Sequence, residues 1–519
     1  MTGLYRPTLC DMITNNAERY GDETAYVFGE NRMTFAEYAA RSRKLASALA
    51  RAGIQPGERV GLLSMNSFEY PVLYGACNLY GFIASTVNFR LAAPEFEYII
   101  NDAGQKILIF EDGYAEQVAQ IRGRLKTVEM FVAIGKAPDW AISYDDFLAG
   151  GDSTGPDLPP PSASDIAVLM YTSGTTGRPK GVMLEHGGLV ENGRQIAAAL
   201  QIGSSDNILL MMPFFHVGAK AVELGQHWQS GTVHMHRSFD AETIFRTIEA
   251  ERITITHMAP TMIQTMLDHP ARENYDLSSL RALLYSAAPM PTPVLRRAIA
   301  AFGPIFVQMY GQTEGSGAVL PAGSHRPDGN EKDIRRLSSI GHAIPGCRFR
   351  IVDENENPVP VGTPGELCFQ GPVTMRGYWN NSSATIEALR GGWLHTGDIA
   401  KADEDGFLYL VDRKKDVIVS GGENIYSREV EEALLQHEEI SEVAVIGVPH
   451  EKWGEAVCAV VVLKPGSSLT ADAIIAHSRN LIAGYKRPQS IHIVSELPKL
   501  VSGKIAKVEL RAIYAKLKS

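Results

Sequence analysis

Residues 171–181 read Tyr171-Thr-Ser-Gly-Thr-Thr-Gly-Arg-Pro-Lys-Gly181, and this stretch decides how the rest of the chain is interpreted. Its glycines allow positive φ angles and a close approach of the backbone to a ligand. Successive N–H groups in such a turn form a concave, positive nest that suits phosphate oxygens, and Lys180 adds a charge. The apolar run Ile166-Ala-Val-Leu-Met-Tyr171 predicts a strand that leads into the loop. The Lys-Ser/Thr ending of a Walker A loop is missing, so another kind of phosphate loop is indicated.

Length, charge and cysteine content exclude several classes of protein. The chain has 519 residues, enough for about two to four domains. A net charge of −10 gives no global field that would attract nucleic acid or an anionic membrane. Five scattered cysteines without a CxxC pair argue against a disulfide framework or a zinc site, and they favour a reducing, cytoplasmic compartment. We expect no secretory leader and no transmembrane segment, because no apolar run approaches the roughly 20 residues that span a bilayer.

Strand-like and helix-like patterns alternate over residues 24–110 and 185–310. Thr34-Phe-Ala-Glu37 has the spacing of a capping box, and Gly53 stands where the cap at the end of that helix belongs. This alternation predicts βαβ units and mostly parallel sheets with helices on both faces. The breaker-rich residues 150–164 predict a linker, and residues 323–336 predict a loop.

The pattern changes in the last third of the chain. Residues 340–412 shift toward a period of two, as in Arg348-Phe-Arg-Ile-Val352, which predicts a more antiparallel, barrel-like module. A boundary falls near Asp412-Arg-Lys-Lys-Asp416, and the remaining residues are enough for a small α+β domain. The predicted fold class is α/β: doubly wound subdomains and a small barrel-like β module, followed by a small mobile α+β domain.

Further motifs carry side chains suited to nucleotide chemistry. Tyr310-Gly-Gln-Thr-Glu314 follows a predicted strand, at the edge where ligands bind in open α/β sheets. Tyr310 offers a flat face for adenine, and Glu314 offers a carboxylate for Mg²⁺. In Trp393-Leu-His-Thr-Gly-Asp398, Asp398 can accept hydrogen bonds from ribose hydroxyls, and Arg413 could approach the same ribose. Each motif taken alone is also compatible with an ordinary capped loop or turn.

Lys504 follows a Ser-Gly pair near the end of the chain, where a lysine is usually solvated. The family resemblance carried by the phosphate-loop string implies that a carboxylate attacks the α-phosphorus of ATP, which brings two anions together and builds further negative charge. A mobile ammonium that contacts both reactants would orient them and stabilise that charge.

The string Ser173-Gly-Thr-Thr-Gly-Arg-Pro-Lys-Gly181 resembles the phosphate loop of the adenylate-forming enzymes. This superfamily includes acyl-CoA synthetases, luciferase-like proteins and the adenylation domains of peptide synthetases. YGQTE at 310–314, WLHTGD at 393–398, DRKKD at 412–416 and SGK at 502–504 follow in the order of that family. The resemblance runs from about residue 10 to about residue 510.

The resemblance implies three functional groups of residues and a magnesium ion held by Glu314. The implied catalytic residues are Lys504, Glu314 and His216. The implied ATP-binding residues are Thr172, Ser173, Gly174, Thr175, Thr176, Gly177, Lys180, Ala287, Ala288, Pro289, Gln308, Tyr310, Gly311, Gln312, Thr313, Asp398 and Arg413. The implied CoA-binding residues are Ser420, Gly421, Gly422, Glu423 and Lys486.

The resemblance also implies an acyl site, gated by the segment Pro213-Phe-Phe-His-Val217. Its implied residues are His216, Ala219, Ser286, Gly311, Gly315 and Ser316. Ser286 departs from the glycine that is usual in the family, which alters the local pocket. The gate segment has no aspartate, and a buried, unpaired substrate ammonium would be costly, so an amino acid is disfavoured. Small pocket residues predict a bulky tail, such as an aromatic propionate, a cinnamate or a medium-chain fatty acid.

By the same resemblance, residues 1–413 are an N-terminal adenylation domain, residues 414–415 a hinge at Lys415, and residues 416–519 a small C-terminal domain. Rotation about the hinge would exchange Lys504 for the Gly421 segment between two half-reactions.

The sequence therefore predicts an ATP-dependent carboxylic acid–CoA ligase with ATP, Mg²⁺ and CoA as its cofactors. Its partners are a small-molecule acid and CoA, with no nucleic acid, and the oligomeric state stays open, a homodimer included. The main alternative is a stand-alone adenylation domain that loads a carrier protein. A nucleotide-binding regulator without chemistry is a further alternative, against which Glu314 and Lys504 speak.

Overall fold

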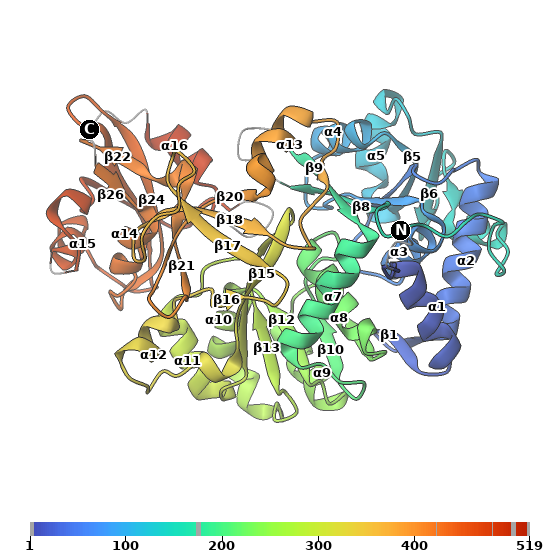
Figure 1. Cartoon of the computed structure of the whole chain (residues 1–519), viewed down its shortest axis with the longest axis horizontal. Helices are drawn as coiled ribbons and strands as arrows, with labels where there is room; N and C mark the ends of the chain where they lie inside the picture. Colours follow the sequence, from blue (N-terminus) through green and yellow to red (C-terminus); the bar gives the residue numbers. More distant parts are fainter. Residues whose placement is uncertain (1–4, 173–177, 422, 480, 500–504, 516–519) are drawn as a thin grey trace.

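A computed structural model describes residues 5–172, 178–421, 423–479, 481–499 and 505–515. Two large, mostly parallel sheets form the N-terminal two thirds, a smaller antiparallel sheet follows, and an α+β unit ends the chain (Figure 1). Within these ranges, no helix is both long and apolar enough to cross a bilayer.

The first large sheet has the strand order β16-β15-β14-β13-β12-β10-β11-β1-β2. Strands β14, β13, β12, β10, β11 and β1 run parallel, and the antiparallel strands β15, β16 and β2 lie at its two ends. Its strands are β1 (Thr24–Phe28), β2 (Asn31–Thr34), β10 (Asn207–Leu210), β11 (Thr232–Met235), β12 (Ile255–Met258), β13 (Ala282–Tyr285), β14 (Phe306–Gln312), β15 (Gly315–Leu320) and β16 (His342–Ala343).

The second large sheet has the order β19-β9-β8-β4-β3-β5-β6-β7. It is parallel from β8 to β7, and β9 and β19 run antiparallel at the other edge. Its strands are β3 (Arg59–Leu63), β4 (Ile83–Thr86), β5 (Gln105–Glu111), β6 (Met130–Ile134), β7 (Ile142–Ser143), β8 (Ile166–Thr172), β9 (Lys180–Glu185) and β19 (Gly377–Tyr378).

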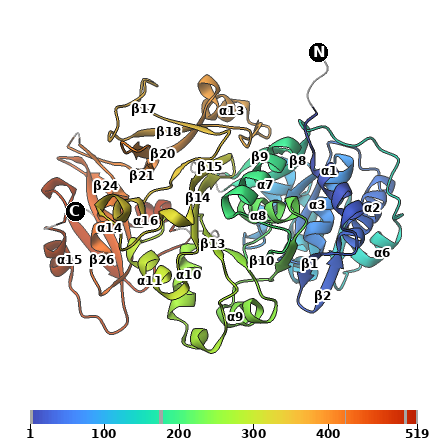
Figure 2. The same cartoon turned by 60° about the horizontal axis from the view of Figure 1, so that its bottom comes forward.

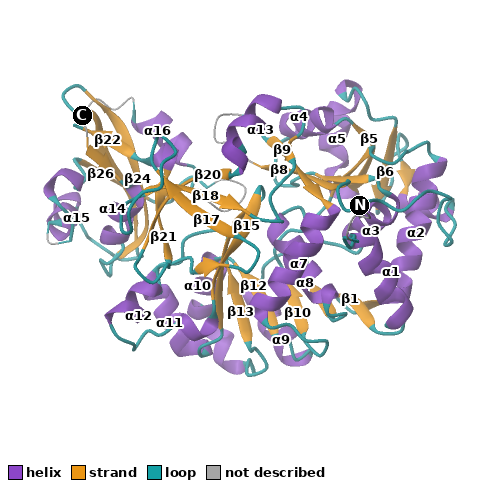
Figure 3. Ribbon diagram, viewed as in Figure 1, coloured by secondary structure: helices purple, strands orange, loops and turns teal. Residues whose placement is uncertain are grey.

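Helices cover both faces of the two sheets, as the doubly wound prediction requires (Figure 3). One continuous core joins the sheets through the helices between them, α1 (Leu9–Arg19), α2 (Phe35–Arg51), α3 (Glu69–Tyr80), α7 (His186–Leu200) and α8 (Val217–Trp228). The outer face of the first sheet packs on α9 (Ala241–Ala250), α10 (Pro260–Asp268) and α11 (Thr292–Phe302). That of the second packs on α4 (Ala93–Ala103) and α5 (Ala115–Ile121), and α6 (Tyr144–Ala149) follows β7.

A smaller antiparallel sheet lies beside the first large sheet (Figure 2). Its strands, in spatial order, are β17 (Arg348–Val352), β18 (Gly365–Gln370), β20 (Leu394–Ala402) and β21 (Leu408–Arg413). The short helix α12 (Glu331–Arg336) precedes this sheet in the chain, and the short helix α13 (Ser382–Ala388) lies between β18 and β20. The antiparallel pairing of these strands confirms the antiparallel module that the period of two predicted for residues 340–412. The sheet is open, because no ladder in the described residues joins β17 to β21.

The C-terminal unit is a small sheet with helices on both faces. Its strands are β22 (Ile418–Ser420), β23 (Glu423–Ile425), β24 (Ile440–His450), β25 (Gly454–Leu463) and β26 (Ser490–Val494). One face packs on α14 (Ser427–Leu434) and α15 (Ala471–Ser478), and the other packs on α16 (Lys507–Tyr514). The expected α+β composition is confirmed.

Several local predictions can be checked directly. The Thr34 hydroxyl accepts from Glu37 N at 3.2 Å and the Glu37 carboxylate accepts from Thr34 N at 3.0 Å, so the capping box is present. Gly53 follows the helix end with φ of +94°, a left-handed conformation suited to glycine. The loop predicted for residues 323–336 is wrong in part: residues 331–336 form α12, because Asn330 and Asp333 make a capping box at its start.

A buried ion pair holds α8 in the core between the two sheets. Lys220 Nζ lies 2.8 Å from Glu223 Oε2, with both side chains at most 2% exposed. The Tyr26 hydroxyl donates to the other Glu223 oxygen, and the Lys220 ammonium lies 4.2 Å from the centre of the Tyr74 ring. These contacts compensate two charges that burial would otherwise make costly.

Glu223→Gln leaves the Lys220 ammonium buried without a carboxylate, so we expect the protein to lose about 3–5 kcal/mol of unfolding free energy. Urea denaturation followed by circular dichroism measures the loss. The double variant Lys220→Met, Glu223→Gln removes the stranded charge and should recover part of it. A Glu223→Gln midpoint equal to that of the wild type would contradict the role of the pair.

Candidate active site

Strands β8 and β9 form the frame of the predicted phosphate loop. They pair antiparallel, with Thr172 opposite Lys180 and Tyr171 opposite Gly181. The Tyr171 hydroxyl donates to Asp102 Oδ2 at 2.6 Å, which fixes the incoming strand to α4. The loop residues Ser173, Gly174, Thr175, Thr176 and Gly177 lie outside the described residues.

Tyr378 connects the far side of this loop to Glu314. Its hydroxyl donates to Glu314 Oε1 at 2.9 Å, and the Lys180 ammonium lies 4.8 Å from the centre of its ring. Burial, and then the Glu314 carboxylate, raise the pKa of Tyr378, so its phenol stays a neutral donor. Because β19 pairs with β9, Tyr378 lies opposite Val182. Tyr378 was not among the predicted site residues, although it stands in a Gly-Tyr-Trp sequence that could have drawn attention.

The predicted ribose carboxylate, Asp398, is 4% exposed and is surrounded by donors. Arg413 Nε lies 2.6 Å from Oδ1, and Oδ2 accepts from the Tyr310 hydroxyl at 2.5 Å and from Gln312 Nε2 at 2.9 Å. Asp398 and Arg413 face each other across β20 and β21. Burial disfavours the guanidinium charge, but the Asp398 carboxylate and the other acidic groups nearby together outweigh it and raise the pKa of Arg413. The structure thus brings together Tyr310, Gln312, Asp398 and Arg413 from two sheets.

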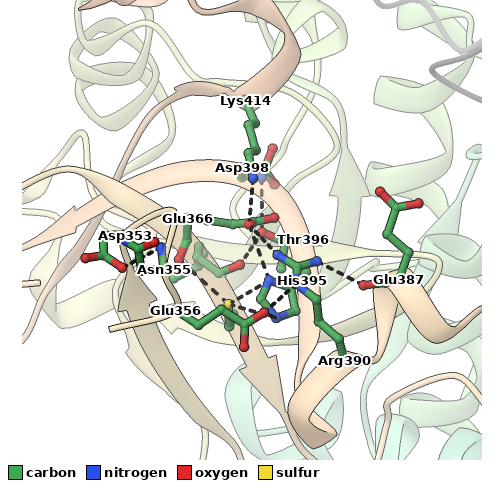
Figure 4. Close-up of polar contacts among 12 residues, drawn as sticks. Asp353, Asn355, Glu356, Glu366, Glu387, Arg390, His395, Thr396, Asp398 and Lys414 are labelled. Atoms are coloured by element: carbon green, nitrogen blue, oxygen red, sulfur yellow. Dashed lines mark hydrogen bonds and ion pairs between the residues drawn. The ribbon is translucent and has the colours of Figure 1, made fainter. Parts of the chain in front are cut away.

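A second polar network continues from the Asp398 strand toward the hinge (Figure 4). Glu366 Oε2 lies 3.1 Å from both Lys414 Nζ and Arg390 Nη2, and 3.3 Å from His395 Nδ1. Burial alone would raise the pKa of Glu366, but Lys414 and His395 outweigh it and lower that pKa. Lys414 immediately precedes the predicted hinge residue Lys415, so this network anchors the hinge on its N-terminal side.

The segment after β13 contains a strained residue that suits a ligand site. Ala287 has φ of +72°, a left-handed conformation that non-glycine residues rarely adopt. On the neighbouring strand β14, Gln308 Oε1 is buried and has no hydrogen-bond partner among the described residues. An unpaired acceptor of this kind fits an adenine amino group. Ala288, Pro289 and Thr313 follow the same strand ends.

The implied acyl residues differ in their surroundings. His216 caps α8, and its ring centre lies 4.3 Å from that of Phe215. Ala219 is fully buried. A Cβ on Gly311 would lie 2.4 Å from Ser316 Cβ, and one on Gly315 would lie 2.8 Å from Leu394 Cδ2. Gly311 therefore permits the close pairing of β14 with β15, and Gly315 permits the close packing of β15 on the smaller antiparallel sheet.

The remaining acyl residues have polar partners. The Ser316 hydroxyl accepts from Asn192 Nδ2 at 2.8 Å, and Ser286 Oγ lies 2.7 Å from His257 Nε2.

The implied CoA residues lie on the C-terminal unit. Ser420 and Glu423 pair across the β22–β23 turn, and Gly421 N donates to Trp453 O at 2.8 Å. Lys486 Nζ lies 2.6 Å from Glu429 Oε1, so the lysine is in an ion pair. Gly422 and Lys504 lie outside the described residues.

A contact of a charged group crosses the predicted hinge. Asp412, before the hinge, accepts from the backbone N–H and the hydroxyl of Ser427, after it, whereas the ion pair of Arg511 Nη2 with Asp416 Oδ1, at 2.7 Å, lies within the C-terminal unit. Burial lowers the pKa of Lys415.

Comparisons with known proteins agree with this geometry. The profile of the AMP-binding enzyme family matches residues 13–379, and that of the AMP-binding enzyme C-terminal domain matches residues 429–504. A feruloyl-CoA synthase from an Amycolatopsis species is 40% identical over 94% of this chain and 95% of its own length. An indoleacetate–CoA ligase from Aromatoleum aromaticum is 35% identical over 98% of both chains. The crystal structure of an anthranilate CoA ligase in complex with anthranoyl-AMP superimposes with a TM-score of 0.90, at 28% identity over 99% of this chain and 98% of that one.

The fold, the frame of the phosphate loop and the polar cluster around Asp398 together define an adenylate-forming enzyme. The chain belongs to the AMP-binding enzyme family. Within that family it is an AMP-forming acid–CoA ligase, and ATP drives its reaction. The family and the enzyme class expected from the motifs are confirmed.

Tyr378→Phe removes the hydrogen bond to Glu314 and keeps the ring over Lys180. A hydrogen bond to a charged group contributes about 1.5–3 kcal/mol, so we expect adenylation kcat/KM to fall roughly tenfold or more. We also expect the half-saturating Mg²⁺ concentration to rise, measured by pyrophosphate release. Tyr409→Phe is the control, because its hydroxyl donates to Asp403 Oδ2 at 2.9 Å, outside these clusters. An unchanged Mg²⁺ dependence in Tyr378→Phe would exclude the hypothesis that Tyr378 orients Glu314 toward Mg²⁺.

Proposed function

We propose that this enzyme activates an aromatic carboxylic acid as its acyl-adenylate and transfers the acyl group to CoA. The observation that carries the site assignment is the convergence of Tyr310, Gln312 and Arg413 on the buried Asp398 carboxylate. A carboxylate held in this way accepts hydrogen bonds from vicinal ribose hydroxyls without moving. Glu314, oriented by Tyr378, is the carboxylate that would hold Mg²⁺, a cation that binds carboxylate and phosphate oxygens.

In the first half-reaction, the substrate carboxylate attacks the α-phosphorus and pyrophosphate leaves. Lys180 and the loop residues 173–177 hold the phosphates, and Gln308 accepts from the adenine amino group. His216 lies beside the attacking carboxylate. Lys504 contacts both anions and stabilises the charge of the transition state, as a preorganised cation does. In the resulting acyl-adenylate, the leaving group on the acyl carbon is AMP, which departs more easily than the oxide of a free carboxylate.

In the second half-reaction, rotation at Lys415 withdraws Lys504 and brings the Ser420–Glu423 turn to the adenylate. The turn and Lys486 bind CoA, and its thiolate attacks the acyl carbon and expels AMP. The domain division at residues 414–415 belongs to this proposal. The cross-hinge contact of Asp412 with Ser427 would be exchanged in the rotation.

The two relatives reported at 35% identity or more support an aromatic acid over a medium-chain fatty acid. The feruloyl-CoA synthase, the indoleacetate–CoA ligase and the anthranilate CoA ligase are all named for aromatic acids. Ser286 contributes a small, half-buried side chain to this site, whereas Ser316, Leu394 and Phe369 fill the space beside Gly311 and Gly315. We place the enzyme in a reducing compartment, because its five cysteines are free thiols in the structure.

A screen of carboxylic acids tests the proposal, with AMP and acyl-CoA measured together. We expect cinnamate, phenylpropionate and indole acids to yield both products, at kcat/KM values on the order of tenfold or more above those of saturated C6–C12 acids. AMP formation without consumption of CoA would favour the carrier-loading alternative. A preference for saturated acids would overturn the aromatic assignment.

Lys504→Ala is expected to lower pyrophosphate release by about a hundredfold or more, because a charged contact to the transition state is lost. Binding of ATP, measured by isothermal titration, should stay within about threefold of the wild-type value, since the lysine contacts ATP chiefly during the reaction. Lys499→Ala changes a nearby lysine in an exposed ion pair with Glu442 instead, and it serves as the control. Pyrophosphate release at the wild-type rate in Lys504→Ala would refute the catalytic assignment.

A further inference from the structure

A polar pair lies at the ends of β12 and β13, next to the start of α8. His257, near the end of β12, is 1% exposed, and its Nε2 lies 2.7 Å from Oγ of Ser286, the residue that follows β13. A Cβ on Gly218 would lie 3.2 Å from His257 Cε1, so the glycine lets the start of α8 pack closely against the ring. Gly218 is two residues from His216, which the proposed function places beside the substrate carboxylate. The pair therefore lies where the acyl group would be held.

The other ring nitrogen of His257, Nδ1, indicates which group donates in the hydrogen bond between Nε2 and Ser286 Oγ. Burial lowers the pKa of His257 to about 4, so the ring is neutral and carries a single N–H. Nδ1 is buried and has no partner among the described residues. A buried N–H without an acceptor is rarer than a buried acceptor without a donor, so the proton belongs on Nε2. His257 then donates to Ser286 Oγ, and the hydroxyl proton of Ser286 is left free.

We propose that Ser286 donates this proton to an oxygen on the tail of the acid, and that His257 positions the hydroxyl. The proposal rests on the proposed function and narrows it. The substrate would be an aromatic acid that bears a hydroxyl, methoxy or keto oxygen, in preference to one with a pure hydrocarbon tail. Ser286 is half-buried and His257 is buried, so the hydroxyl is the accessible member of the pair.

The preference for oxygenated acids has a desolvation cost as its basis. A hydrocarbon tail would remove water from the Ser286 hydroxyl without offering an acceptor in its place. Sites built to hydrogen-bond a substrate group reject the analogue that lacks it more strongly than they reject a missing methylene. We expect a kcat/KM ratio on the order of tenfold or more between an oxygenated acid and its bare analogue.

Matched acids test the proposal on the full-length enzyme. The probes are cinnamate, its ring-hydroxylated forms and its ring-methoxylated forms, with AMP formation measured in the presence of CoA. At the ring position that reaches Ser286, we expect hydroxyl and methoxy acids to share the advantage, because both oxygens accept a hydrogen bond. A methoxy acid that reacts no better than cinnamate would overturn the assigned direction of the bond, and with it the proposal.

Two variants separate the hydroxyl from its support. Ser286→Ala should lower the ratio to near one, because kcat/KM falls much more for the oxygenated acids than for cinnamate, whereas Ser286→Thr should retain the preference. His257→Phe keeps the ring and removes the N–H, so we expect a higher KM for the oxygenated acids only, at an unchanged kcat.

The possible outcomes divide clearly. Equal losses for all acids in Ser286→Ala would indicate a structural role and refute the proposal. The same conclusion follows from an unchanged ratio, or from a wild-type ratio near one. If no acid of either set yields AMP, it is the proposed function that fails, whereas turnover of aromatic acids without any preference refutes the inference alone.

Discussion

The carboxylate of Asp398 must be buried and still keep its charge, and much of the site follows from how that is achieved. Arg413 supplies the opposite charge from the adjacent strand, and the Tyr310 and Gln312 side chains donate from the first large sheet. A buried carboxylate without such partners would be strongly disfavoured. These contacts to Asp398 therefore join the smaller antiparallel sheet to the end of β14. They also hold Arg413, the last residue before the hinge, in place.

The hinge lies between two sets of ionic contacts. Glu366 holds Lys414 on the N-terminal side, and Arg511 holds Asp416 on the C-terminal side. Only Asp412 reaches across in this group, through Ser427. Contacts made within each unit hold its end of the hinge in place, whereas the contact of Asp412 with Ser427 would have to be exchanged in a rotation. A rotation localised at Lys415 is consistent with this division.

Particular residues show how far the sequence could predict the site. The approach of Arg413 to Asp398 was expected from the motifs, and both residues belong to one antiparallel hairpin of strands. Tyr378 was not predicted, because it contacts Glu314 across 64 residues and belongs to another sheet. Ser286 was selected as an unusual residue, but its partner His257 lies on a different strand. Helix α12 was taken for a loop, because it is short and polar and depends on its capping residues.

The sequence by itself determined most of the order and kind of the local elements and the chemistry of the motifs. Apolar periodicity and capping residues act over a few positions, so they can be read from neighbouring letters. Only the tertiary structure decided that β1 joins β11, that β19 joins β9, and that His257 meets Ser286. Such contacts depend on which apolar faces bury one another across the whole chain, and a local pattern carries no information about its distant partner.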